Sequence, residues 1–226
     1  SISINEIPLG ASGYKKLCQG DFYLILNCGN IMPSYQPGHL HADMLHMVLY
    51  YKNNAILVDT GISTYENNPS RLHEKATASH NTVCFENENQ SQIWSVFRMA
   101  KRAKVQLISF SNNSLEACVT WHNGFQHKRS ILLTGNCLRI EDCIVPLRGK
   151  LKSTIANFHF DASIQLEPSE NEWHIHKPGL KIKFENSHQI ELANYEQAVD
   201  FNSKLDSTKL TVHFEKTLIT YFKLIS

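Results

Sequence analysis

The sequence has almost no net charge, no long apolar run and no recognisable leader. Its 22 lysine and arginine residues balance 21 acidic residues, for a formal net charge of +1, whereas nucleic-acid-binding domains carry a clear basic excess. No apolar run approaches the roughly 18 residues of a membrane-spanning helix. Ser1 to Leu9 lacks the basic and apolar regions of a signal peptide. We expect neither a nucleic acid nor a membrane as partner, and we interpret the N-terminus as a cut that hides the compartment.

The cysteine spacing argues against two kinds of site. None of the six cysteines belongs to a C-x-x-C pair, so the sequence does not support a zinc ribbon or a thioredoxin-like redox site. Most of them lie in or beside apolar runs, which favours buried free thiols that act as small hydrophobes. One or two disulfides remain an alternative if the protein is exported.

Helical periodicity is also nearly absent, apart from one short helical turn that we expect within 69–78. Short runs of apolar, β-branched and aromatic residues recur between polar turns instead, as a pleated sheet favours. These runs span 22–27, 44–51, 55–59, 81–85, 102–110, 115–121, 130–133, 138–145, 153–160, 180–185, 209–215 and 218–224. Turn signals, including those at 53–54, 177–179 and 202–207, separate the runs.

Two of the runs alternate strictly between apolar and polar residues, at 180–184 and at 210–214. This period places one face of each strand in a core and the other face in solvent. With 42% hydrophobic residues, the chain can form a substantial core. The sequence therefore predicts an all-β fold, a large antiparallel β-sandwich that forms a single domain over 1–226.

Residues suited to metal binding gather at the ends of three of the predicted strands. In the motif GHLHAD, His39 and His41 are two residues apart, so on an extended segment they face the same side, as does Asp43. Asp59 ends an apolar run at a Thr-Gly turn, and His80 immediately precedes another run. Imidazole and carboxylate groups are ligands that zinc prefers, and three of them leave a fourth position for water or substrate. Spacing alone leaves metal binding open.

Several comparisons limit this interpretation. His174 and His176 have the same spacing but no carboxylate cluster, and we interpret that pair as the solvated face of a strand. The H-x-H-x-D-H motif of metallo-β-lactamase-type hydrolases fails at Met44, and the cupin motif lacks its glutamate until Glu66. His46, inside an apolar run, is interpreted as a core or sheet-face histidine.

Taken together, the motifs of this region resemble a known family. The parts are GHLHAD, VDTG followed by Tyr65, SHNTV, and Gln90 with Trp94, within residues 10–105. They resemble the C-terminal β-domain of heparinase II/III-like polysaccharide lyases. The second half of the chain resembles that family only as a strand-rich continuation.

The resemblance implies a fold, a reaction and a set of roles. Such bacterial proteins join an N-terminal α/α-toroid to a β-sandwich of super-sandwich type, and they cleave acidic polysaccharides by β-elimination. By the matching motifs, His41, Asp59 and His80 hold one divalent metal, expected to be zinc. His39 faces the substrate, and Tyr65 is nominated as a catalytic residue. The family also favours a periplasmic or secreted location, which the sequence itself leaves unknown.

Other residues receive supporting roles. Asp43 or Asn81 is expected to hold the second nitrogen of a metal-binding imidazole, and Gln90 to brace the loop around His80. Arg71 is a candidate for binding a substrate carboxylate, although an ordinary salt bridge explains it equally well. We expect the metal to fix the loops that carry His39.

The toroid of the family, with further catalytic residues, has no counterpart in this chain, which is therefore expected to be inactive alone. Two hypotheses follow. The chain is either the metal-binding domain of a polysaccharide lyase, or a sandwich used for carbohydrate binding or assembly without catalysis.

Overall fold

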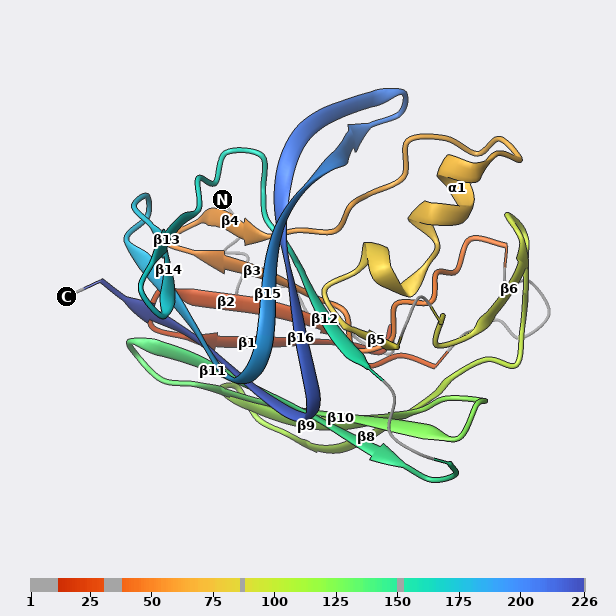
Figure 1. The fold of residues 1–226 in the computed structure, drawn as a ribbon, viewed down its shortest axis with the longest axis horizontal. Coiled ribbons are helices and arrows are strands. Elements are labelled where there is room, and N and C mark those ends of the chain that lie inside the picture. Colours follow the sequence, from red (N-terminus) through yellow and green to blue (C-terminus); the bar gives the residue numbers. More distant parts are fainter. Residues whose placement is uncertain (1–11, 31–37, 86–87, 150–152, 226) are drawn as a thin grey trace.

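The computed structural model describes residues 12–30, 38–85, 88–149 and 153–225, so the segment Ser1 to Leu9 lies outside the described residues. Strands dominate the described part of the chain (Figure 1). The predicted all-β sandwich is confirmed, with antiparallel pairing between neighbouring strands in each sheet.

The first sheet is a meander of four strands in the order β1-β2-β3-β4. These are β1 (Tyr14–Gln19), β2 (Phe22–Asn27), β3 (Met47–Tyr51) and β4 (Asn54–Leu57). The run predicted at 44–51 becomes a strand only from Met47, because Leu45 has a left-handed φ of 61° and turns the chain just before it. His46 therefore precedes the strand instead of lying within it.

The second sheet has ten strands, eight of which follow the order β13-β14-β15-β16-β11-β10-β9-β8, while β12 and β5 pair with each other and β12 also pairs with β16. Their bounds are β5 (Val83–Phe85), β8 (Lys104–Phe110), β9 (Ser114–Thr120), β10 (Phe125–Leu133), β11 (Cys137–Pro146), β12 (Thr154–His159), β13 (Glu167–Ser169), β14 (Glu172–Ile175), β15 (Leu180–Asp200) and β16 (Ser203–Leu224).

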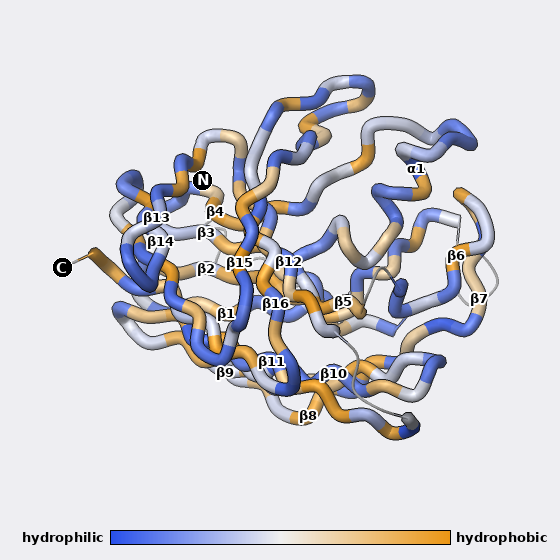
Figure 2. The backbone as a smooth tube through the Cα atoms, in the orientation of Figure 1, coloured by the Kyte–Doolittle hydropathy of each residue, from blue (hydrophilic) through white to orange (hydrophobic). Residues whose placement is uncertain are grey.

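The core lies between the two sheets and follows the predicted alternation. Leu180, Ile182, Leu210, Val212 and Phe214 are fully buried, and hydrophobic positions alternate with hydrophilic ones along the strands of the sandwich (Figure 2). His174 and His176 lie outside this core, where each contacts a glutamate. All six cysteines are free thiols, as the sequence favoured.

The hairpin of β15 and β16 is much longer than predicted. The runs at 209–215 and 218–224 form one strand of 22 residues, and the turn predicted over 202–207 is strand from Ser203 onward. The distal half of the hairpin projects beyond the sandwich, opposite α1 (Figure 1). Backbone N–H groups of Ala198 and Asn202 donate to Thr60 and Ser63, which ties the hairpin to the segment after β4.

Two short helices and a small hairpin complete the described structure. The predicted helical turn is confirmed as α1 (Pro69–Glu74), whose N-cap Asn68 side chain accepts from the backbone N–H of Arg71, and the 3₁₀ turn η2 (Thr77–Ser79) follows it. Strands β6 (Gln92–Ser95) and β7 (Arg98–Ala100) form a separate hairpin. Neither helix in the described part of the chain is long and apolar enough to cross a membrane.

Candidate metal centre and adjoining cavity

Three loops meet beside the first sheet, and each carries a candidate residue. Residues 38–46 lead into β3 through a series of turns, so the extended segment expected around His39 and His41 is wrong. Asp59 follows β4, and His80 follows η2. The structure thus brings together three segments that are distant in sequence.

The carboxylate of Asp59 is the centre of this cluster. Its Oδ2 lies 2.8 Å from Nδ1 of His80 and 3.1 Å from Nε2 of His46. Its Oδ1 accepts from the backbone N–H of Gly61 at 2.8 Å. One ligand atom from each of His46, Asp59 and His80 lies within 4.8 Å of the other two. A His-Asp-His group able to hold a metal is therefore present.

The charges of this group are strongly coupled. Burial alone would raise the pKa of the Asp59 carboxyl, but the His80 and His46 imidazoles hold it well below its usual range. Burial opposes the protonation of His80, yet Asp59 raises the pKa of that imidazole above its ordinary value. Burial lowers the pKa of His46 to about 4, so that ring is neutral at physiological pH. The result is an ionised carboxylate between two imidazoles.

His41 lies beside this group with a different partner. Its ring centroid is 5.2 Å from that of His80, and its Nε2 accepts from Nη1 of Arg71 at 3.0 Å. Burial lowers the pKa of His41 to about 3, which keeps the ring neutral beside the guanidinium. The structure places the predicted ligand His41 beside His80, but it is not one of the three residues whose ligand atoms lie within 4.8 Å of one another. It also adds His46, which the sequence analysis interpreted as a core histidine.

Arg71 is fully buried on α1. Its Nη1 lies 3.6 Å from Oε2 of Glu74, and its guanidinium lies 5.5 Å from the centroid of the Tyr65 ring. Its Nε and Nη2 have no hydrogen-bond partner among the described residues. The salt bridge that the sequence left open is therefore observed, and a role for Arg71 in binding a substrate carboxylate stays a prediction.

His39 and Tyr65 face solvent beside the metal group. Their ring centroids are 5.9 Å apart in an edge-to-face arrangement, and Tyr65 stacks on Phe201 from the tip of the β15–β16 hairpin at 6.4 Å. A cavity of about 600 Å³ is lined by His39, His41 and Asp59, among others. The two residues nominated for catalysis are therefore neighbours, and His39 lines the open cavity.

The predicted supporting residues hold the loops in place. The backbone N–H of Asn81 donates to Nδ1 of His46 at 2.9 Å, and its amide donates to Met47 and Val58. Gln90 bonds both the N–H and the carbonyl of Met44. Asp43 does not reach a histidine: its carboxylate accepts from Asn27 at 3.1 Å.

The donor set fits a metal such as zinc, which prefers imidazole nitrogen with carboxylate oxygen. Oδ2 of Asp59 and Nδ1 of His80 support this fit, because they lie 2.8 Å apart and face each other, as two atoms that bind one ion do. Asp59 and His80, with one further histidine, would hold the ion.

A buried ion pair supports the loops from the second sheet. Arg129 on β10 bonds Asp142 on β11 through Nε and Nη2, at 2.7 and 3.0 Å. Nη1 of Arg129 donates to the carbonyls of Leu45 and Asn81 at 2.7 and 2.8 Å. Those two residues adjoin His46 and His80. Arg129 thus links the core of the sandwich to both histidine-bearing loops.

Lys75 fixes the loop that carries His39. It is fully buried, and its ammonium donates to the carbonyls of Gly38 and Val96 at 3.1 and 2.8 Å. The backbone carbonyl of Lys75 accepts from Ala42 at 2.9 Å. The sequence analysis missed Lys75, Arg129 and the position of His46. The one usable sign was the position of Arg129, which shares one face of β10 with Phe125, Ile131 and Leu133.

The environment of Lys75 predicts a specific pH effect. Burial lowers the pKa of Lys75 from 10.5 to about 8 in the folded protein. Between pH 8 and pH 10.5, Lys75 therefore carries a proton in the unfolded chain but largely not in the folded one, so the free energy of unfolding rises with pH. We expect the free energy of unfolding of the wild type, measured by urea denaturation, to rise across this interval relative to that of Lys75→Met. Parallel pH curves for the two proteins would contradict the assignment.

Comparison with known families supports the resemblance. The family model described as Heparinase II/III-like, C-terminal, matches residues 5–218. No curated protein matches the chain.

Solved structures share the fold at low sequence identity. A heparinase III gene product is 13% identical with a TM-score of 0.73, over 95% of this chain and 35% of its own. A heparan sulfate lyase HepC mutant from Pedobacter heparinus is 14% identical with a TM-score of 0.72, and the match covers 97% of this chain and 36% of the lyase. A putative aldose 1-epimerase from Escherichia coli K12 is 10% identical with a TM-score of 0.51, and the match covers 93% of this chain and 98% of the epimerase. The chain spans about a third of the two lyase structures, and these likenesses show the fold alone.

Proposed function

Because this chain belongs to the heparinase II/III-like, C-terminal family of domains, we propose that it is the metal-binding domain of a lyase. Its substrate would be an acidic, uronate-containing polysaccharide, cleaved by β-elimination. The observation that carries this proposal is the contact of Tyr65 with His39, which lines an open cavity beside the group of His46, Asp59 and His80.

The chemistry requires two kinds of group in that place. Elimination removes the proton at C5 of a uronate and breaks the bond from C4 to the leaving oxygen, so that a double bond forms between C4 and C5. The C5 proton is weakly acidic until the neighbouring carboxylate is neutralised, and a hydrogen-bonding imidazole such as His39 would supply that stabilisation. A tyrosine such as Tyr65 would accept the C5 proton and return a proton to the leaving oxygen.

The metal would have a supporting role. A zinc ion on His41, Asp59 and His80 would supply positive charge and fix the geometry of three loops. His39 and His41 lie on one loop, so an ion held at His41 restricts the position of His39. Asn81, Gln90 and Lys75 act on the same loops through their hydrogen bonds to backbone groups.

We expect this chain alone to have little or no lyase activity, and to contribute to catalysis when joined to an α/α-toroid domain. The absorbance of the unsaturated uronate, measured with several acidic polysaccharides, tests both states. In the joined protein, His39→Ala and Tyr65→Phe should each lower kcat by about 100-fold or more, because each removes a group that acts in proton transfer or charge stabilisation.

His176→Ala is the matched control, since His176 lies in the turn between β14 and β15 and contacts Glu167. Its activity should equal that of the wild type. Unchanged cleavage in a folded His39→Ala protein would reject the catalytic role and favour the alternative, a non-catalytic carbohydrate-binding or structural sandwich. Robust turnover by the chain alone would contradict the need for the toroid.

A further inference from the structure

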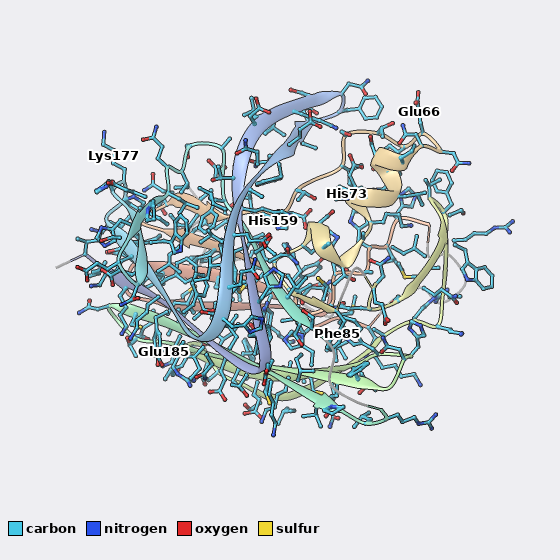
Figure 3. The ribbon with its side chains drawn as sticks, in the orientation of Figure 1. Glu66, His73, Phe85, His159, Lys177 and Glu185 are labelled. Carbon is cyan, nitrogen blue, oxygen red and sulfur yellow. The ribbon has the colours of Figure 1, made fainter. Side chains whose placement is uncertain are left out.

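A second cavity lies on the other side of the segment that follows β4. It has a volume of about 470 Å³ and is lined by residues of α1, of β12 and of the β15–β16 hairpin. Asp59 and Gly61 line the cavity at the metal centre, whereas Thr60 lines this one. His73 of α1 and His159 of β12 mark its two sides (Figure 3).

Three side chains that line this cavity each have a polar atom that bonds to no described residue. The ammonium of Lys209 makes no hydrogen bond or ion pair with any described residue, and Lys209 stands directly opposite His159 in the register of β12 and β16. Oγ1 of Thr60 has no partner either, although Thr60 is only 6% exposed. His159 donates from Nδ1 to the side-chain oxygen of Asn81 at 3.2 Å, which leaves Nε2 as a free acceptor.

The acidic residues of the cavity are already engaged. Oε1 of Glu74 accepts from the N–H and the hydroxyl of Ser63, at 2.9 and 2.5 Å, and Oε2, which has no hydrogen bond, lies 3.6 Å from Nη1 of Arg71. Glu196 pairs with Lys204 at 2.8 Å. Lys209 is therefore a cation without a counter-ion on a half-buried wall. Burial lowers the pKa of Lys209, as expected for a partly desolvated ammonium.

We propose that this cavity is a second carbohydrate subsite that binds an acidic sugar unit, with its carboxylate on Lys209 and hydroxyl groups on Thr60 Oγ1 and His159 Nε2. A carboxylate supplies the missing counter-ion, and sugar hydroxyls both donate and accept hydrogen bonds. The choice of a sugar rests on the proposed function, whereas the choice of an anion rests on the cavity itself. The subsite would hold a unit of the chain beyond the bond that is cleaved.

The test is binding to the 226-residue chain, followed through the ring C–H signals of His73 and His159 in NMR spectra. The probes are sodium glucuronate, glucose and sodium sulfate, at matched ionic strength. We expect saturable shifts of both signals with glucuronate. Glucose, which lacks the negative charge, and sulfate, which lacks the sugar hydroxyls, should each bind at least about tenfold more weakly.

Lys209→Met should weaken glucuronate binding by about tenfold or more, and Thr60→Val should weaken it without removing the charge. Lys183→Met is the control, because Lys183 lies on β15 away from the cavity and pairs with Glu185. Absence of shifts, or equal binding of glucuronate by Lys209→Met, would overturn the subsite. Equal binding of sulfate and glucuronate would overturn its specificity for a sugar. The readout needs no cleavage, so it is independent of the elimination reaction.

Discussion

Replacing Arg129 with methionine should lower the free energy of unfolding by about 3–5 kcal/mol, the range for breaking a buried ion pair by removing one partner. Arg129 and Asp142 are both fully buried. Burial alone would raise the pKa of Asp142, but Arg129 and His127 hold it well below its usual range. Without the guanidinium, the carboxylate is left with His127 alone and must either protonate or remain an unpaired charge.

The same substitution removes two donors from the metal centre. The carbonyls of Leu45 and Asn81 accept from Nη1 of Arg129, and methionine cannot replace those bonds. We therefore expect zinc affinity to fall together with stability. A purely local packing defect would lower stability and leave zinc binding unchanged.

Lys128→Met is a matched control, because Lys128 is the preceding residue on the same strand and pairs with Glu116 at the surface. An exposed pair contributes at most about 1 kcal/mol. A double variant, Arg129→Met with Asp142→Leu, should be more stable than Arg129→Met alone, because it removes the unpaired charge. Urea denaturation measures all three, and a loss below about 1 kcal/mol for Arg129→Met would contradict the assigned role.

The strands could be predicted where apolar alternation reports burial directly. The run at 22–27 matches β2 residue for residue, and the alternation at 210–214 matches the buried positions of β16. The projecting half of the β15–β16 hairpin was missed because both of its faces are largely outside the core. Residues 186–200 have no continuous apolar face, so their pairing with β16 depends on register rather than on hydrophobic pattern.

The candidate site could be predicted only in part, for a different reason. Histidines and aspartates at strand ends stand out in a sequence, whereas Lys75 and Arg129 look like surface residues. They are buried because backbone carbonyls or side chains from distant segments satisfy them, and a local pattern cannot reveal such partners. His46 is buried and hydrogen-bonded, as interpreted, but its contact with Asp59 was not expected, because the turn at Leu45 removes it from the strand that its apolar neighbours suggest.

The identity of the third metal-binding histidine gives the sharpest test of the metal centre. We expect His41→Ala to lose stoichiometric zinc, as should Asp59→Asn and His80→Ala. His46→Ala should retain one zinc ion with an affinity that is about 10 to 100 times lower, the usual cost of removing a group that orients a ligand. Elemental analysis after equilibration with zinc gives the stoichiometry, and competition with a chelator gives the affinity.

The hydrogen bonds of the His46 and His41 rings are the reason that we expect His41 to bind the ion and His46 not to. Nδ1 of His46 accepts from the backbone N–H of Asn81, so the neutral ring carries its hydrogen on Nε2, the atom that faces Asp59. A backbone donor cannot turn away, and His46 therefore orients the carboxylate instead of binding the ion. Nε2 of His41 accepts from Nη1 of Arg71, which also lies near Glu74. If the guanidinium turns fully toward Glu74, the lone pair of His41 Nε2 becomes free to bind the ion. One zinc ion retained by His41→Ala and lost by His46→Ala would reverse the two roles and place the ion on His46, Asp59 and His80.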